Sequence, residues 1–299
     1  MELRQLEYAL AVADELHFGR AAERMHVTQQ SVSEQIRRLE RELGAPLFTR
    51  TSRRVAVTTV GEAFLPAARR VVAASAHARD VGRRAARGLA GEVRVGYAED
   101  VDPRLIRLVA PHLVARTPPV QVVPRPMTTP DQITALLERR IDAGFGWNPD
   151  LPAPLTGLLV ERAALVVAVA ADHPLAAEPA VDPARLSQQP LVLVPRSVNA
   201  LLHDRIVGQL AARGAAVRIH QEVSSLDRML PLVLAGSAVG ISSPAAAALH
   251  AVPGVTYLPF TDPSPVIDCH LLWRRDSTDS AVAQLVEVVR ALRDSGTFR

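Results

Sequence analysis

The chain has 299 residues, of which 48% are hydrophobic and 22% charged, a length and composition that suit two globular domains or one large one. This composition excludes a disordered protein and a collagen-like fibre, and the single cysteine, Cys269, excludes an intrachain disulfide. The charged start, residues 1–7, lacks the apolar core of a secretory signal, and the longest apolar run, residues 163–171, is about half of a membrane span. We therefore expect a cytoplasmic protein without a membrane partner.

Positive charge is concentrated in the amino-terminal third. The first 90 residues contain 15 Arg and 10 acidic residues, whereas the rest contains 19 Arg and 21 acidic residues. This distribution favours a nucleic acid as the partner of the amino-terminal region. All 34 basic residues are Arg, which suits phosphate and guanine edges, although the complete absence of Lys is more simply explained by codon bias.

Three short helices are expected at the amino terminus. Apolar residues recur at helical spacing over residues 3–15, and a second short helix is expected from Phe18. Thr28 is a good N-cap for a third helix, and Gly44 is a good C-terminal stop for it. This order of elements predicts a helix-turn-helix.

The outer face of the third helix carries polar groups suited to DNA. Amides and hydroxyls near its start suit base edges in the major groove, and the arginines that follow suit guanine or phosphate. A polar face alone is more often simply solvated, but the basic turn at residues 50–54 separates two β-prone stretches and predicts a wing along the minor groove. The candidate DNA-binding residues are Thr28, Gln29, Gln30, Ser31, Ser33, Glu34, Arg37, Arg38, Arg53 and Arg54.

Residues 26–40 closely resemble the recognition segment of LysR-type transcriptional regulators, and residues 43–50 and 58–62 keep in step with the pattern of that family. The resemblance implies an α/β protein with an amino-terminal winged helix-turn-helix, a long linker helix and a periplasmic-binding-protein-like effector domain of two subdomains. It also implies promoter or operator DNA, a small-molecule effector and a second copy of the chain as partners, in a homodimer or homotetramer, with RNA polymerase as a further candidate.

One residue of the recognition segment departs from the family pattern. Members commonly have Arg where this chain has Glu34. A carboxylate at that position would repel phosphate and could accept a hydrogen bond from cytosine N4. The base preference of the half-site is therefore left open by the sequence.

A long helix is expected after the wing. Thr59 and Glu62 have the spacing of a capping box, with Thr59 as the N-cap. Apolar residues then recur at alternating spacings of four and three, a narrow seam that suits pairing of two helices or, equally, packing on the helix's own domain. The resemblance favours dimerisation, because family members pair through this helix. The seam residues are Val60, Phe64, Ala67, Val71, Ala74, Ala78, Val81 and Ala85.

Strand and helix patterns alternate from residue 91 onward. This alternation predicts mainly parallel sheets with helices on both faces, over a length that allows two subdomains. We assign a DNA-binding domain to 1–58, a linker helix to 59–90 and an effector domain to 91–299, with subdomain I at about 91–160 plus 267–299 and subdomain II at about 161–266. Strands are expected at 92–98, 120–125 and 142–146 and in the apolar stretches 158–171, 190–195, 215–223, 238–242, 255–260 and 268–273, and helices near 103–115, 131–140, 199–212, 226–236 and 278–293.

Ligands of such sheets bind where strands end and helix N-termini present free N–H groups. Ser, Thr and Asn at these junctions could orient a carboxylate but are equally plain helix caps, and Arg196 could clamp an anion or be an exposed loop charge. Residues 141–146 are similar to members that sense aromatic acids, yet Trp147 stands where those members often carry a basic residue, so a small anionic or aromatic effector is expected without a specific identity. The candidate effector-binding residues are Ala98, Glu99, Thr128, Thr129, Trp147, Arg196, Ser197, Asn199, Ser224 and Ser225.

No motif points to an enzyme. The sequence has neither a Gly-rich phosphate loop nor a His-Glu-x-x-His helix, and its histidines are scattered. We therefore expect no catalytic residue, metal or cofactor. The alternative function is a non-enzymatic cytosolic ligand-binding module whose amino-terminal helices mediate protein contacts, but such a module would not need the polar and basic face of the third helix.

Overall fold

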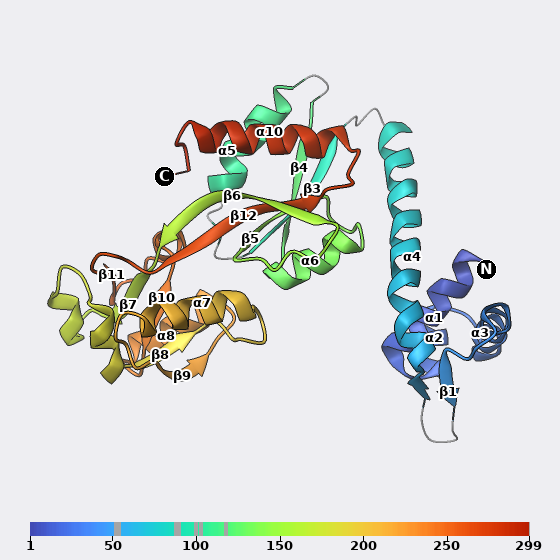
Figure 1. The fold of residues 1–299 in the computed structure, drawn as a ribbon, viewed down its shortest axis with the longest axis horizontal. Helices are drawn as coiled ribbons and strands as arrows, with labels where there is room; N and C mark the ends of the chain where they lie inside the picture. Colours follow the sequence, from blue (N-terminus) through green and yellow to red (C-terminus); the bar gives the residue numbers. More distant parts are fainter. Residues whose placement is uncertain (51–54, 87–90, 99–100, 102–103, 117–118, 299) are drawn as a thin grey trace. The chain divides into compact units, whose positions relative to one another are not determined.

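The computed structural model describes residues 1–50, 55–86, 91–98, 101, 104–116 and 119–298. These residues form two compact units, an amino-terminal unit that includes α4 and a carboxyl-terminal unit that begins at β3 (Figure 1). The predicted wing residues Arg53 and Arg54 and the predicted effector residue Glu99 lie outside the described residues.

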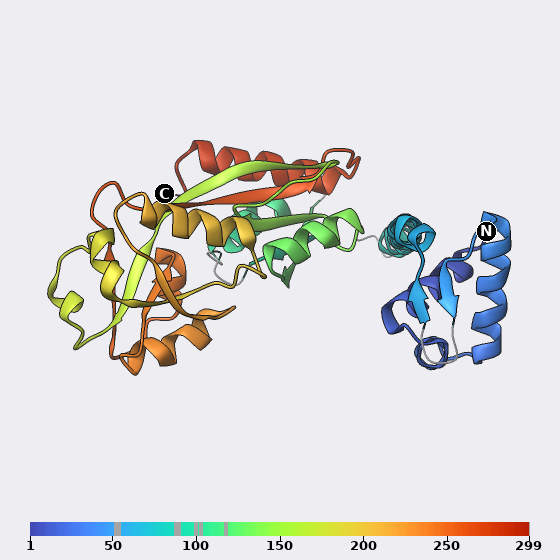
Figure 2. The same ribbon diagram turned by 60° about the horizontal axis from the view of Figure 1, so that its bottom comes forward.

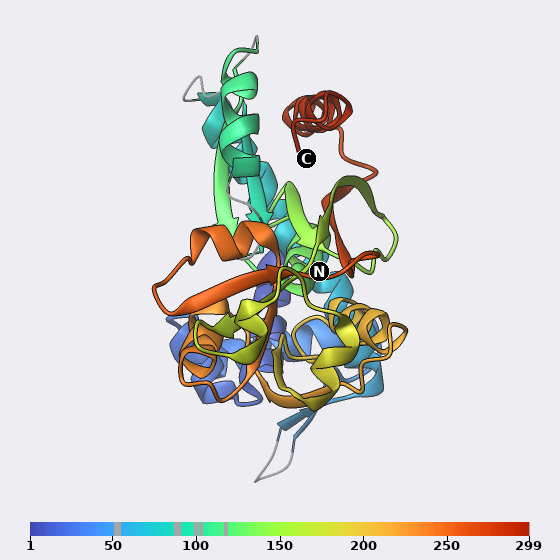
Figure 3. The same ribbon diagram turned by 90° about the vertical axis from the view of Figure 1, so that its left-hand side faces the viewer.

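The amino-terminal unit packs three helices against the start of a fourth. Val12, Val32 and Ile36 are fully buried among these helices. The strands β1 and β2 pair antiparallel, with Phe48 opposite Val57, and extend beyond the helices as the base of a wing (Figure 3). The predicted order of three helices and two short strands is confirmed. The elements are α1 (Leu3–Glu15), α2 (Phe18–Arg24), α3 (Gln29–Leu43), β1 (Phe48–Arg50), β2 (Val55–Val57) and α4 (Thr59–Ala86).

Both predicted ends of α3 are confirmed. The Thr28 hydroxyl accepts a hydrogen bond from the backbone N–H of Ser31 at 3.2 Å, and Gly44 ends the helix with a φ of 72°. The Glu40 carboxylate then accepts from the backbone N–H groups of Leu47 at 2.9 Å and Phe48 at 3.3 Å. These two bonds fix the start of β1 to the last turns of α3.

The predicted N-cap of α4 is wrong by one residue. Thr58, not Thr59, accepts the hydrogen bond from the backbone N–H of Gly61, at 3.0 Å, and its carbonyl accepts the first helical bond from Glu62 at 2.8 Å. Thr58 also donates its backbone N–H to Leu47 at 3.0 Å, so the hairpin ends and the helix begins at the same residue. Thr59 and Glu62 therefore do not form the predicted capping box.

The first sheet of the carboxyl-terminal unit has the strand order β4–β3–β5–β12–β6. Helices α5 and α10 cover one face and α6 covers the other (Figures 1 and 2). The elements are β3 (Glu92–Tyr97), α5 (Arg104–Val114), β4 (Gln121–Pro126), α6 (Thr129–Leu137), β5 (Ala143–Trp147), β6 (Leu155–Ala164), β12 (Val266–Arg274) and α10 (Ser280–Asp294).

The second sheet has the strand order β11–β7–β10–β8–β9. Alternate residues of its strands face opposite sides, so Leu191 packs with α7 while Val192 packs with α8. The short helix α9 was not predicted, because its run of alanines carries no periodicity. The elements are β7 (Val166–Ala170), β8 (Pro190–Leu193), α7 (Ala200–Ala211), β9 (Arg218–Glu222), α8 (Leu226–Leu234), β10 (Val239–Ser242), α9 (Pro244–Leu249) and β11 (Val255–Pro259), with two 3₁₀ turns at Pro174–Ala177 and Pro183–Gln188.

Both sheets are mixed, which corrects the prediction of mainly parallel sheets. The pairs β3–β4, β3–β5, β8–β9 and β8–β10 are parallel, and the other four pairs are antiparallel. The single apolar stretch at 158–171 contains two strands, β6 in the first sheet and β7 in the second, and the predicted boundary near residue 160 falls within β6. Apolar runs show that a strand is buried but do not show its direction, which explains the error.

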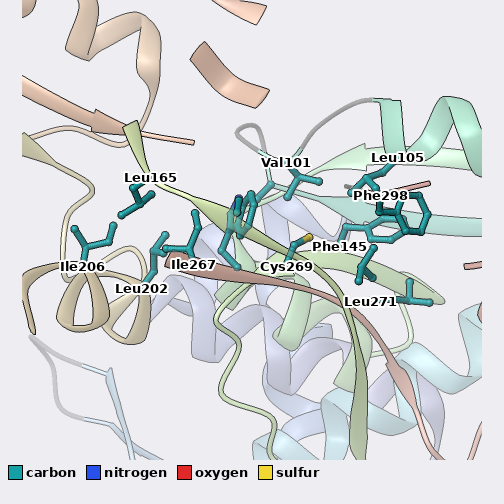
Figure 4. Packing of buried hydrophobic residues seen from close by; sticks show 14 of the residues in the cluster. Val101, Leu105, Phe145, Leu165, Leu202, Ile206, Ile267, Cys269, Leu271 and Phe298 are labelled. Carbon is teal, nitrogen blue, oxygen red and sulfur yellow. The ribbon is translucent and has the colours of Figure 1, made fainter. Parts of the chain in front are cut away.

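One apolar core runs from the first sheet to the second. Leu165 and Ile267 lie where the chain passes between the sheets, and they share a cluster of buried residues with Leu202 and Ile206 of α7 (Figure 4). Cys269, on β12, is fully buried in the same cluster. In the part of the chain that the structure describes, no helix is both long and apolar enough to cross a membrane.

Candidate nucleic-acid interface and effector site

The outward face of α3 forms a shallow groove, which we call the α3 groove. The opposite face is buried, with Val32, Ile36 and Leu39 all at 0% exposure. Because the helix repeats every 3.6 residues, burial of these three positions directs the polar residues between them to solvent. The groove is lined by Gln29, Gln30, Ser33, Glu34, Arg37, Glu40, Arg41, Gly44, Ala45 and Pro46.

The structure brings together five of the predicted DNA-binding residues and separates others from them. Gln29, Gln30, Ser33, Glu34 and Arg37 line the α3 groove. The other three described candidates, Thr28, Ser31 and Arg38, do not. Arg41 also lines the groove; the sequence places it on the outer face of this helix, one helical turn after Arg37, but it was not among the candidate DNA-binding residues.

Arg38 faces the amino terminus of the chain. Its guanidinium lies 3.6 Å from the Glu2 carboxylate and 4.0 Å from that of Glu42. Glu42 in turn contacts the amino-terminal ammonium of Met1 at 2.6 Å, and this hydrogen bond lowers the pKa of the Glu42 carboxyl group. The charges on this side of α3 therefore compensate one another, whereas Arg37 and Arg41 have no ion pair within the described residues.

Helix α4 packs on the amino-terminal unit mainly through residues outside the predicted seam, although the seam residue Phe64 also packs against the core of that unit. Leu65 and Ala68 are buried in the core of the unit, at 6% and 2% exposure. The seam residues Val60 and Val71 are 44% and 47% exposed. Of the remaining seam residues, Phe64 and Ala67 are half-buried, Ala74 and Ala78 are exposed, and the side chains of Val81 and Ala85 are outside the described ones.

Most predicted effector residues at the edge of the first sheet form internal hydrogen bonds. Thr128 caps α6 and donates its hydroxyl to Asp131 at 2.7 Å. The buried Thr129 hydroxyl accepts from the backbone N–H of Trp147 at 3.0 Å, and the Ala98 N–H donates to the carbonyl of Phe145 at 3.2 Å. Thr129 therefore joins α6 to β5, Ala98 joins the end of β3 to β5, and Thr128 caps α6.

Trp147 and Asn199 link the first sheet to α7. Trp147 is only 2% exposed, and among the described residues its indole Nε1 has no hydrogen-bond partner. The Asn199 amide donates to the Trp147 carbonyl at 3.1 Å and accepts from the backbone N–H of Leu202 at 3.0 Å. Asn199 therefore caps α7 and also contacts Trp147, another predicted site residue that is distant in the sequence.

The predicted anion clamp is already occupied by a carboxylate of the chain. Arg196 donates two hydrogen bonds to Asp204, both at 2.8 Å. These bonds hold the pKa of the Asp204 carboxyl group below its usual range and raise the pKa of Arg196. Ser197 beside it is exposed.

A second, smaller pocket lies beside α8. Ser224 is the predicted effector residue that lines it, while Ser225 forms the N-cap of α8 without a side-chain hydrogen bond. The pocket combines apolar walls with two carboxylates and one guanidinium, and the sequence patterns did not indicate most of these residues. It is lined by Pro195, Val198, Gln221, Glu222, Val223, Ser224, Asp227, Arg228, Pro231 and Leu232.

A winged helix-turn-helix joined to a two-sheet α/β unit defines a class of protein, the ligand-responsive DNA-binding regulators. Residues 3–62 match the family model of bacterial regulatory helix-turn-helix proteins of the lysR family, and residues 86–294 match that of the LysR substrate binding domain. The chain belongs to the LysR family, and it is a DNA-binding transcriptional regulator with an effector-binding domain.

Similarity extends over the whole chain. The transcriptional regulator IlvR of Caulobacter vibrioides is 35% identical over 292 residues, which cover 97% of each chain, and ShiR of Corynebacterium glutamicum is 31% identical over 96% of this chain and 98% of its own. The crystal structure of full-length CbnR in complex with its target DNA superposes with a TM-score of 0.74 at 28% identity, over 97% of this chain and 99% of that one.

Proposed function

We propose that the outward face of α3 inserts into the major groove of operator DNA. The residues of the α3 groove that contact bases there are Gln29, Gln30, Ser33, Glu34 and Arg37. The observation that carries this proposal is the gathering of these side chains on one exposed face, opposite a fully buried one. Gln suits adenine and Arg suits guanine or phosphate. Arg41 and the predicted wing residues Arg53 and Arg54 add phosphate or minor-groove contacts, and Thr28, Ser31 and Arg38 support the helix from its cap and its other side.

The proposal includes a homodimer formed through α4. Its seam keeps Val60 and Val71 exposed while Leu65 and Ala68 on another face pack on the amino-terminal unit. Two exposed seams can bury each other in a coiled contact without disturbing the helix-turn-helix. A dimer presents two recognition helices to two half-sites, and a tetramer made of two such dimers is the larger assembly we propose.

A small effector completes the proposed mechanism. We place it at the carboxyl ends of the strands, where Ser224 lines the pocket beside α8 and the other candidate residues surround the junctions. Because Arg196 is paired with Asp204, an anionic effector would have to displace that carboxylate or use Arg228 instead. An effector that binds one arrangement of the two sheets more tightly shifts the population towards it, and with it the spacing of the DNA-binding units.

The proposed function needs only binding of DNA and of an effector, and no catalytic step. In the part of the chain that the structure describes, no group of His, Cys, Asp and Glu is arranged to hold a metal ion. We propose that the protein acts by binding alone and that it does so in the cytoplasm, where its operator DNA lies. RNA polymerase at the same promoter is the further partner that we propose.

Binding to labelled DNA from upstream of the protein's own gene tests this proposal. At one fixed moderate salt concentration, the full-length protein is expected to prefer this DNA over a scrambled sequence. Gln30→Ala and Arg37→Ala should each weaken specific binding by about tenfold, because each removes one base contact. Glu42→Ala is the matched control, since Glu42 lies on α3 but outside the α3 groove.

Two results would contradict the proposal. Equal, salt-sensitive binding to both DNAs would reduce the amino-terminal unit to a generic basic surface. No binding at all by a folded dimer would favour the ligand-binding module whose amino-terminal helices contact proteins.

A further inference from the structure

Glu34 lies in the middle of a stripe of polar residues on α3. Gln30, Glu34, Arg37 and Arg41 follow one another at spacings of four, three and four, which places them on one side of the helix. All four are exposed and line the α3 groove. Glu34 is therefore one helical turn from Gln30, in the half of the helix whose residues reach base edges in helix-turn-helix proteins.

Within the residues that the structure describes, the carboxylate of Glu34 makes no contact that stabilises the fold. Of the other two acidic residues on α3, Glu40 accepts hydrogen bonds from the backbone of β1, and Glu42 pairs with the amino terminus. Glu34 has no hydrogen bond or ion pair within the described residues. Arg38, one turn further along, points instead to Glu2 and Glu42.

An unpaired carboxylate in the major groove can be satisfied by few partners. It accepts hydrogen bonds and donates none, and it is repelled by the phosphates on both sides. Guanine and thymine present only acceptors along the major-groove edge, whereas cytosine presents the N4 amino group and adenine presents its N6 amino group beside the N7 acceptor. Cytosine is the base whose edge offers a donor without an adjacent acceptor to repel the carboxylate.

We infer that Glu34 is a specificity-determining residue that accepts a hydrogen bond from the N4 amino group of one cytosine in each half-site. This inference rests on the proposed function of the α3 groove. Glu34 acts mainly by rejection, because guanine and thymine leave its desolvated carboxylate without a donor and adenine places the N7 acceptor beside it. The step of four residues from Gln30 to Glu34 advances about 6 Å along the helix axis, and base pairs are about 3.4 Å apart. This cytosine therefore lies within about two base pairs of the base that Gln30 reads.

Selection of bound sequences from a randomised DNA library tests the inference with the full-length protein. The wild type, Glu34→Gln, Glu34→Ala and Glu42→Gln are compared, and Glu42→Gln removes the same charge from the same helix outside the α3 groove. All three substitutions affect exposed side chains, and thermal unfolding followed by circular dichroism checks that each variant is folded.

The wild type and Glu42→Gln should select cytosine at one shared position in each half-site. Glu34→Gln should change that position to adenine, because an amide both donates to N7 and accepts from N6. Glu34→Ala should lose roughly tenfold of the discrimination at that position and leave the neighbouring positions unchanged.

Two outcomes would overturn the inference, and they are distinguishable. If the wild type selects a defined site and the Glu34 variants select the same bases at every position, the assignment of Glu34 fails while the proposed function stands. If the wild type selects no sequence, the proposed function fails and the assignment of Glu34 fails with it.

Discussion

The α3 groove and the strand-end edge of the first sheet contain the same kinds of side chain but use them differently. Gln, Ser and Glu in the α3 groove mostly point to solvent, whereas Thr128, Thr129 and Asn199 at the sheet edge are bound to the protein itself. A helix satisfies its backbone internally, so the side chains on its exposed face remain available to a partner. At a strand-to-helix junction the backbone needs caps, and polar side chains supply them first.

The largest expected effect separates the two faces of α3. Ile36→Ala, at a position with 0% exposure, should lower the free energy of unfolding of the amino-terminal unit by about 3 kcal/mol, because it leaves a cavity between the helices. Gln30→Ala on the exposed face should change it by less than about 0.5 kcal/mol. Urea unfolding followed by circular dichroism measures both, and comparable losses would show that the groove residues also support the fold.

A second prediction compares polar residues in the two regions directly. Asn199→Ala removes the cap of α7 and the bond to the Trp147 carbonyl, and should cost the carboxyl-terminal unit about 2 kcal/mol. Ser33→Ala in the α3 groove should leave the unfolding curve unchanged and weaken DNA binding instead. If the Asn199→Ala variant is as stable as the wild type, the wild-type Asn199 amide is not needed for the fold and is available to bind a ligand.

The sequence predicted features that depend on local geometry but not those that depend on how distant segments pair. The caps of α3 and its buried residues were predictable, because Thr28, Gly44 and the helical repeat depend on local geometry. The directions of β7 and β12 were not, because apolar runs carry no information on pairing. The partner of Arg196 was also beyond the sequence, since Asp204 follows it by eight residues and this spacing carries no pairing signal across the start of α7.

A smaller effect on the free energy of unfolding is expected at the start of α4, where substitution of each of two adjacent threonines tests which one caps the helix. Thr58→Ala should cost about 1 kcal/mol of unfolding free energy, because the Gly61 N–H loses its acceptor and the Pro46 carbonyl loses its donor. Thr59→Ala, one residue inside the helix, should be nearly neutral, since alanine is a better helix former. If the two variants lose equal stability, the helix does not begin where the structure places it.

The smallest expected effect concerns the Arg196–Asp204 pair. The Arg196 guanidinium lowers the pKa of Asp204 in the folded state, so the pair stabilises the fold at pH values above the unfolded pKa of Asp, near 3.9, and loses this contribution as the pH falls through the lowered folded value. Because both side chains are exposed, the contribution is screened by salt and small. Asp204→Asn should therefore unfold slightly more easily than the wild type at pH 7, and the difference should disappear in strongly acidic buffer. Equal stability of the two proteins at every pH would mean that the pair does not hold Arg196, and Arg196 would then be free to bind an anionic effector.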